Sequence, residues 1–170
     1  MPESRNTANR QRLAATPKPR TNVRHHLVIL RDEYLELMIA GRKRIECRLS
    51  AVRRPPFEAV SPGDLLWLKL PSRPIHAVAT AGQCEFHALG AGTSLNTLLS
   101  KWSAQICAAE GFFEGASAWA KFASLIWIET VVVIRPMPVY KSDQRAWVVL
   151  DQMPFPQMRI GRQREITTRP

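Results

Sequence analysis

The fold of this chain is decided by the sequence Gly-Arg-Lys-Arg-Ile-Glu-Cys-Arg at residues 41–48. Just before it, Leu35, Met38 and Ile39 have the i, i+3, i+4 spacing of an apolar helical stripe. This spacing predicts a helix over residues 32–40 that Asp32 caps. Gly41 then stands where the end of a helix needs a residue that tolerates positive φ. The first half of the stretch therefore predicts a sharp helix end.

Beyond Gly41 the pattern changes to a period of two, which predicts a strand over residues 43–49. Its two faces divide into apolar Ile45, Cys47 and Leu49 and charged Arg44, Glu46 and Arg48. Glu46 and Arg48 are thus expected side by side, close to Lys43. One interpretation is a surface corner with a structural Glu46–Arg48 ion pair. The other is a binding site that uses the same three side chains.

The rest of the chain alternates between strand-like runs and turn signals such as Ser61-Pro62-Gly63-Asp64. Strands are predicted at 26–30, 65–70, 75–86, 124–134 and 145–150, and Gly82 predicts a bulge in the third of these. Helices are predicted at 95–109, capped by Ser94 and ended by Gly111, and at 115–121. This order predicts an α+β fold: a small mixed, mostly antiparallel β-barrel with flanking helices.

The positive charge of the chain lies mainly at its ends. Residues 1–24 hold six basic side chains and one acidic one, and residues 152–170 hold four and one. Residues 25–151 are nearly balanced, with 14 basic and 12 acidic side chains. We therefore predict a disordered basic tail at 1–24, one domain at 25–151 and a basic C-terminal tail at 152–170.

Composition argues against several classes of protein. The three cysteines are far apart and form no C-x-x-C pair, which argues against a disulfide framework and a zinc site. His76 and His87 have no carboxylate pair nearby, so we expect no metal and no cofactor. His25 and His26 are expected to face solvent in part. No apolar run is long enough to cross a bilayer and no secretory signal is visible, so we expect a cytoplasmic protein without a membrane partner.

The spacing G-x-K-x-x-E-x-R, formed by Gly41, Lys43, Glu46 and Arg48, resembles the signature of the ASCH domain, a member of the PUA-like superfamily of small β-barrels. Weaker likenesses are the turn Pro62-Gly63-Asp64 before a strand, the stretch 123–127 ahead of an apolar strand, and the closing stretch 144–149. The resemblance covers roughly residues 26–150. It implies a PUA-like barrel with a cleft at its mouth that the motif lines.

The resemblance also implies a partner: RNA or a modified nucleotide, with DNA and the oligomeric state left open. The binding residues it implies are Gly41, Arg42, Lys43, Arg44, Glu46, Arg48 and Trp147. Lys43 would act as a point charge for a phosphate and Arg48 as a planar donor fork. Trp147 could stack on a base, an interaction worth about 1–3 kcal/mol, whereas Trp127 is expected in the core.

Two other functions stay open at this point. Some ASCH-like proteins are hydrolases of acylated cytidines, but the threonine nucleophile of that branch is replaced here by Glu46. Others are ribonucleases, in which a tyrosine shortly precedes the lysine, whereas Tyr34 lies nine positions before Lys43. A hydrolase would use Lys43 and Glu46 as its candidate catalytic pair. A protein-interaction module would instead use the corner around residue 41 and the basic tails.

Overall fold

The computed structural model describes residues 22–90, 94–109 and 111–160. Residues 1–21 of the predicted N-terminal tail and 161–170 of the predicted C-terminal tail lie outside these ranges. The elements in chain order are β1 (His25–Ile29), α1 (Asp32–Ile39), β2 (Ile45–Ser50), β3 (Leu65–Lys69), β4 (Ile75–Ala88), α2 (Leu95–Ile106), α3 (Phe112–Ser117), β5 (Phe122–Met137), β6 (Val139–Lys141), β7 (Trp147–Leu150) and β8 (Met158–Ile160). Few helices and many strands confirm the predicted α+β class.

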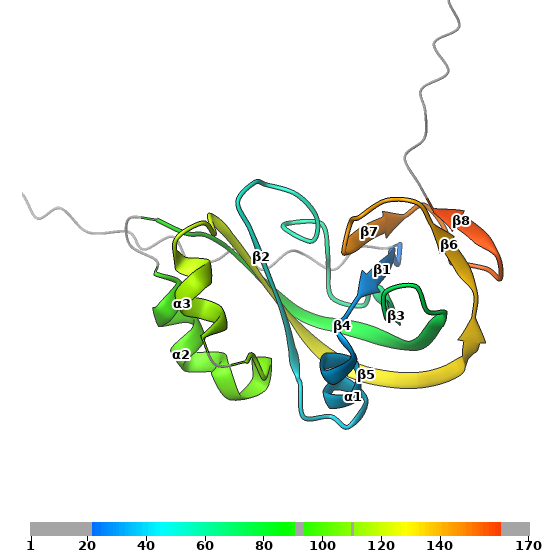
Figure 1. The fold of residues 1–170 in the computed structure, drawn as a ribbon, viewed down its shortest axis with the longest axis horizontal. Coiled ribbons are helices and arrows are strands. Elements are labelled where there is room, and N and C mark those ends of the chain that lie inside the picture. Colours follow the sequence, from blue (N-terminus) through cyan, green and yellow to red (C-terminus); the bar gives the residue numbers. More distant parts are fainter. Residues whose placement is uncertain (1–21, 91–93, 110, 161–170) are drawn as a thin grey trace, which may run out of the picture.

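Six strands form one mixed sheet in the order β2-β5-β4-β3-β1-β7. Every neighbouring pair is antiparallel except β1 and β3, which are parallel. The sheet curls into a half-barrel around the long strands β4 and β5, while α2 and α3 lie together at one end (Figure 1). Among the described strands, the edges β2 and β7 are not paired with each other. The half-barrel therefore has an open seam between β2 on one side and β1 and β7 on the other.

The predicted bend in β4 is present. The register between β4 and β5 shifts between Ala81 and Cys84, on either side of Gly82. A Cβ atom at Gly82 would lie only 2.8 Å from the side chain of Glu129, so only glycine fits there without a shift of that side chain. The small residues Ala77, Ala79 and Ala81 of β4 share one face and are completely buried. Short side chains at these positions let the sheet curl tightly.

The apolar face of β2 packs against α2. Ile45 and Leu125 share a buried cluster with Leu95, Leu99 and Ile106, and Cys47 and Leu49 pack at its margin. Ser94 caps α2 as predicted, its Oγ accepting a hydrogen bond from the Thr97 amide at 3.1 Å. None of the helices in the described ranges has the length and apolar character needed to span a bilayer.

Each of the three described helices differs from its prediction at one or both ends. Asp32 is the first helical residue rather than the cap, because Arg31 takes the N-cap position without a side-chain cap. Helix α2 ends at Ile106 with Cys107 in the left-handed conformation, so Gly111 does not end it. The segment just before β2 supplies donors for the last carbonyls of α2: the Arg44 amide donates to Gln105 O at 2.8 Å and Lys43 Nζ donates to Ile106 O at 2.7 Å.

Gly111 instead begins the next helix. With φ of 75° it is the N-cap of α3, which consequently covers Phe112–Ser117 and not the predicted range 115–121. A further difference lies in the segment 152–170, where a tail was predicted. Its residues Met158–Ile160 form β8, which pairs in parallel with β6, and Ile160 is buried.

Candidate functional site

The turn at Gly41 aims Lys43 into the molecule. Gly41 has φ of +70°, as its predicted place at the helix end requires. The amides of Arg42 and Lys43 then donate to the same carbonyl, Leu37 O, at 2.9 and 3.0 Å. This tight closure of α1 reverses the chain within three residues, so that β2 begins with its charged face toward the seam.

Lys43 is 3% exposed and its ammonium group contacts three oxygen atoms. Its Nζ donates to Ile45 O at 3.0 Å and Ile106 O at 2.7 Å, and lies 3.4 Å from Glu46 Oε2. The first two contacts are hydrogen bonds and the third is an ion pair. The ring of Tyr34 covers the same nitrogen at 4.9 Å. Lys43 thus ties the end of α2 to the start of β2 and holds Glu46.

Arg48 crosses the open seam. Its Nε donates to Glu46 Oε1 at 2.6 Å, and its Nη2 donates to the carbonyl of Ile29 on β1 at 2.7 Å. The guanidinium carbon lies 5.6 Å from the ring centroid of Trp147 on β7. No strand pairing joins these edges in the described residues, and the Arg48 side chain provides a direct link between them.

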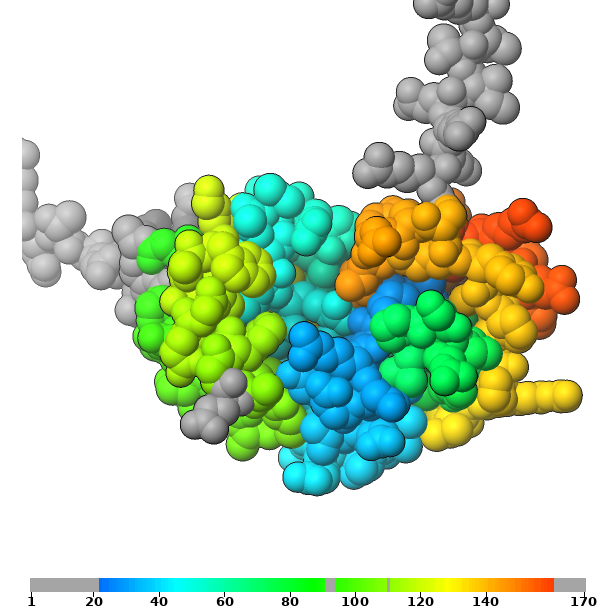
Figure 2. Space-filling model, in the orientation of Figure 1, coloured from blue at the N-terminus to red at the C-terminus, as the bar shows by residue number. Residues whose placement is uncertain are grey.

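Arg48 lines two hollows, one on each side of it. Figure 2 shows the face of the molecule where the segment around β2 (cyan), the segment around β1 and α1 (blue) and the segment around β7 (orange) come together. The larger hollow has a volume of about 370 Å³ and the smaller about 260 Å³. The smaller hollow includes Tyr34, Lys43, Glu46, Phe112 and Trp119 among its walls. We call the two hollows together the seam cleft.

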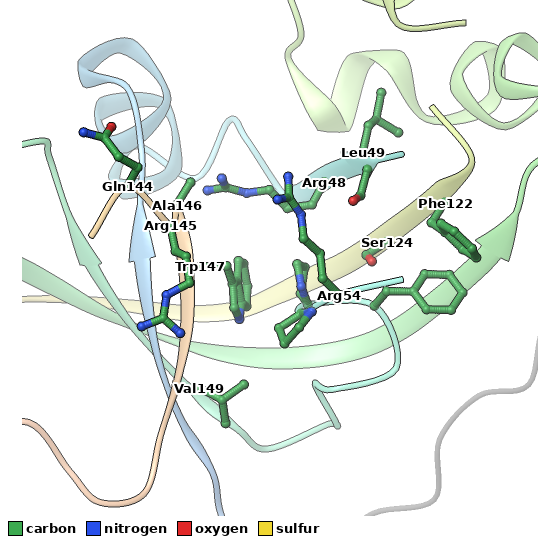
Figure 3. A pocket seen from close by; sticks show the side chains of 14 residues that line it. Arg48, Leu49, Arg54, Phe122, Ser124, Gln144, Arg145, Ala146, Trp147 and Val149 are labelled. Atoms are coloured by element: carbon green, nitrogen blue, oxygen red, sulfur yellow. The ribbon is translucent and has the colours of Figure 1, made fainter. Parts of the chain in front are cut away.

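The larger hollow is basic and aromatic. Its walls include the three arginines Arg48, Arg54 and Arg145 and the three aromatic residues Phe57, Phe122 and Trp147, several of which Figure 3 shows around the cavity. None of its wall residues is acidic. Ser124, which pairs with Arg48 across β2 and β5, adds a hydroxyl group. A cavity of this chemistry suits a planar, negatively charged ligand.

The structure separates the residues predicted for the site into two groups. Lys43, Glu46, Arg48 and Trp147 line the seam cleft. Gly41 shapes the turn, while the exposed side chains of Arg42 and Arg44 line neither hollow. Sequence reasoning missed Arg54, Arg145 and Trp119, since they come from a loop, the approach to β7 and the end of α3. The signal for Arg54 in the sequence is a cluster of basic residues within thirteen positions, which consists of Arg42, Lys43, Arg44, Arg48, Arg53 and Arg54.

A buried polar chain supports Trp147 from behind. The indole Nε1 lies 3.2 Å from His26 Nδ1, and His26 Nε2 lies 3.1 Å from Asp64 Oδ2. An indole N–H is only a donor, so Nδ1 accepts and the histidine proton sits on Nε2, facing the carboxylate. Burial lowers the pKa of His26, while Asp64 opposes that shift. His26 is completely buried, so its predicted solvent exposure is wrong.

Asp64 holds the other end of this chain. Its carboxylate accepts hydrogen bonds from the amides of Arg24 at 2.9 Å and Ser61 at 2.8 Å. The turn Ser61-Pro62-Gly63-Asp64 is thereby fixed against the start of β1. The contacts explain how a carboxylate can be buried in the core: each of its oxygens is hydrogen-bonded.

The cysteines have no visible role in the seam cleft. Burial raises the pKa of Cys47, which borders the smaller hollow, to about 12, so its thiol stays protonated and unreactive at neutral pH. Within the ranges that the structure describes, no three His, Cys, Asp or Glu side chains are grouped as metal ligands.

No protein-family model matches the sequence, and no curated protein matches it. Among solved structures, an ASCH protein from Zymomonas mobilis aligns with a TM-score of 0.53 at 18% identity over 66% of this chain and 71% of its own. Two variants of that protein, with a tyrosine replaced by phenylalanine and a serine by alanine, align with the same TM-score at 17% identity over 66% of this chain and 74% and 72% of theirs. The chain has an α+β fold similar to that of this ASCH protein.

Proposed function

We propose that this protein binds single-stranded RNA or a modified nucleotide in the seam cleft. The observation that carries the proposal is the set of three arginines around an acid-free cavity with aromatic walls. Phosphate groups pair with arginine forks, and bases stack on aromatic rings. A nucleotide offers both features in one molecule, and a cavity of about 370 Å³ is of the size that small ligands occupy.

The three arginines differ in how free they are. Arg54 has no hydrogen bond or ion pair to any other described side chain, so its guanidinium is available for a phosphate. Arg48 is held by Glu46 and Ile29, which leaves part of its fork for a ligand. Arg145 is paired with Asp143, its Nε lying 2.7 Å from Oδ2. The proposal therefore assigns the main phosphate contact to Arg54 and a fixed, orienting contact to Arg48.

The smaller hollow adds a stacking surface. Trp119 is 48% exposed and Phe112 is 42% exposed, both at the margin of this hollow. Large exposed aromatic side chains beside a cavity are typical of sites that stack bases. Glu46 is the carboxylate of this hollow, and it could accept a hydrogen bond from a base amino group. The larger hollow would thus bind the phosphate near Arg54, and the smaller hollow would bind a base near Trp119.

The alternative function is hydrolysis of RNA or a modified nucleoside by Lys43 and Glu46. The two groups are close, at 3.4 Å, and Tyr34 shares their hollow. A general base, however, needs a free lone pair, whereas the Lys43 ammonium donates hydrogen bonds to two backbone carbonyls and is ion-paired with Glu46. This occupancy favours binding over catalysis by Lys43, so we propose a binding function first.

Two neighbouring arginines allow a matched test. Arg54 lines the larger hollow, whereas Arg53 pairs with Glu58 and does not. Fluorescence anisotropy with a labelled single-stranded RNA hexamer would compare wild type, Arg54→Gln and Arg53→Gln. We expect about a tenfold loss of affinity in Arg54→Gln, because one charged hydrogen bond is worth about 1.5 kcal/mol, and little change in Arg53→Gln.

Equal losses in both variants would mean that the hexamer binds through general charge alone, and would contradict the proposal. The same samples, followed by mass spectrometry, test the alternative. RNA cleavage that Glu46→Gln abolishes would favour the hydrolase.

A further inference from the structure

We propose that a third hollow, next to the seam cleft, is a binding site for a phosphate group, with the buried Lys69 in its wall. This hollow lies between the turn after β3 and the segment 138–146, and its volume is about 620 Å³. Its charged wall residues are Lys69, Arg73, Lys141, Asp143 and Arg145. The inference does not rest on RNA binding in the seam cleft.

Lys69 is the unusual residue of this hollow. It is the last residue of β3, is 4% exposed and lines the cavity. Its Nζ donates one hydrogen bond, to Leu70 O at 2.9 Å, and no described carboxylate lies within ion-pair distance of it. A buried ammonium group with unused protons and no counter-ion is costly unless an anion completes it. Burial and, to a smaller extent, the neighbouring Lys141 lower the pKa of Lys69.

The carboxylate that lines this hollow does not serve as a counter-ion for Lys69. Asp143 is the hollow's carboxylate, and it is already bound by Arg145 and Lys141. Arg145 foremost, together with Lys141, holds the pKa of Asp143 well below its usual range, so it stays ionised and compensates for one positive charge only. Arg73, exposed at the rim, adds a fourth basic group. Four basic side chains against one carboxylate leave a concave site with excess positive charge.

The hollow adjoins the seam cleft. Gln144, Arg145 and Ala146 line both cavities, so one short segment separates them. A phosphate group could reach the Lys69 hollow from two sources: a free phosphate compound, or the backbone of an RNA that extends out of the cleft. The chemistry recognised is the same, and the length of the ligand distinguishes the sources.

The first experiment titrates the full-length protein with inorganic phosphate and pyrophosphate by isothermal calorimetry. Lys69→Met keeps most of the apolar side chain and removes the charge. Arg73→Gln removes a rim charge without touching the core, and Lys101→Met on α2 is the control for a surface lysine. We expect at least a tenfold loss of affinity in Lys69→Met, about a threefold loss in Arg73→Gln and none in Lys101→Met.

If Lys69→Met fails to fold by circular dichroism, Arg73→Gln carries the test. Absence of saturable phosphate binding by the wild type overturns the proposal, and so does equal affinity in wild type and Arg73→Gln. These outcomes are independent of RNA binding, so failure of the cleft proposal leaves the phosphate titration intact.

The second experiment measures RNA dinucleotides and hexamers against wild type and Arg73→Gln. If Arg73→Gln weakens binding of the hexamer but not of the dinucleotide, the site is assigned to the RNA backbone. If Arg73→Gln binds both RNAs as the wild type does but binds inorganic phosphate more weakly, the site is assigned to a free phosphate compound.

Discussion

Arg48 and Trp147 come from the two opposite edges of the sheet, yet the Arg48 guanidinium lies 5.6 Å from the Trp147 ring. The same guanidinium donates to Ile29 O on β1. Where a closed barrel would join its edges by backbone hydrogen bonds, the Arg48 side chain reaches across from β2 to β1 and β7 in this half-barrel. The residue that closes the seam is also shared by both hollows of the cleft, which couples the stability of the fold to its proposed site.

Replacement of Arg48 by alanine should therefore loosen the fold. The change removes one hydrogen bond to Ile29 O and one to Glu46, and charged hydrogen bonds are worth about 1.5–3 kcal/mol each. We expect the free energy of unfolding to fall by about 2 kcal/mol in urea titrations. Arg44→Ala, an exposed change just before the same strand, should stay within about 0.5 kcal/mol of wild type. Equal stability of the two variants would show that Arg48 does not close the seam.

Replacement of the buried Lys43 by methionine should be more damaging. Ile45 O and Ile106 O lose a donor, and Glu46 loses one of its two cationic partners. Removal of one member of a buried ion pair typically costs about 3–5 kcal/mol. The double variant Lys43→Met/Glu46→Gln should lose less than the sum of the single losses, because the two groups interact. Additive losses in this double-mutant cycle would mean that Lys43 and Glu46 act separately.

Stability should depend on pH through His26. Burial lowers its pKa below the ordinary 6.5, against the opposing effect of Asp64 and with smaller lowering effects from Arg24 and His25. The unfolded chain therefore takes up a proton near pH 6.5 that the folded chain accepts only at lower pH. The contribution of His26 is complete above pH 6.5 and falls as pH drops, by at most about 1.4 kcal/mol per pH unit.

Urea titrations between pH 7.5 and 5 would measure this dependence in wild type and in His26→Gln. The three other histidines are common to both proteins, so the difference between the two curves isolates His26. Parallel curves would contradict the assignment of a buried, neutral His26.

Local sequence signals predicted the part of the fold that contains the motif. Leu35 and Met38 are buried on one face of α1, Gly41 has the expected positive φ, and Ile45, Cys47 and Leu49 pack on α2. Each of these features depends on neighbours within a few residues. The pattern of period 3.6 followed by period two was therefore sufficient to locate them.

Features that depend on distant partners were not predictable in this way. His26 is hydrogen-bonded to Asp64, 38 residues away in the sequence, and to Trp147, 121 residues away. Taken alone, each of these residues resembles an ordinary surface or core residue. Strands β6 and β8 are three residues long and too short for a periodic signal. Arg54 and Arg145 meet in one hollow only because the curl of the sheet brings the loop after β2 close to β7.

The most direct test of the proposed cleft is to locate bound RNA on the protein. Full-length protein would be irradiated with a short single-stranded RNA that contains 4-thiouridine, and the cross-linked residues identified by mass spectrometry. We predict cross-links at the aromatic residues of the cleft, above all Trp119, Phe57 and Trp147, which Arg54→Gln reduces. Cross-links confined to residues 1–24 and 152–170 would show that the basic ends alone bind RNA, and would contradict the account.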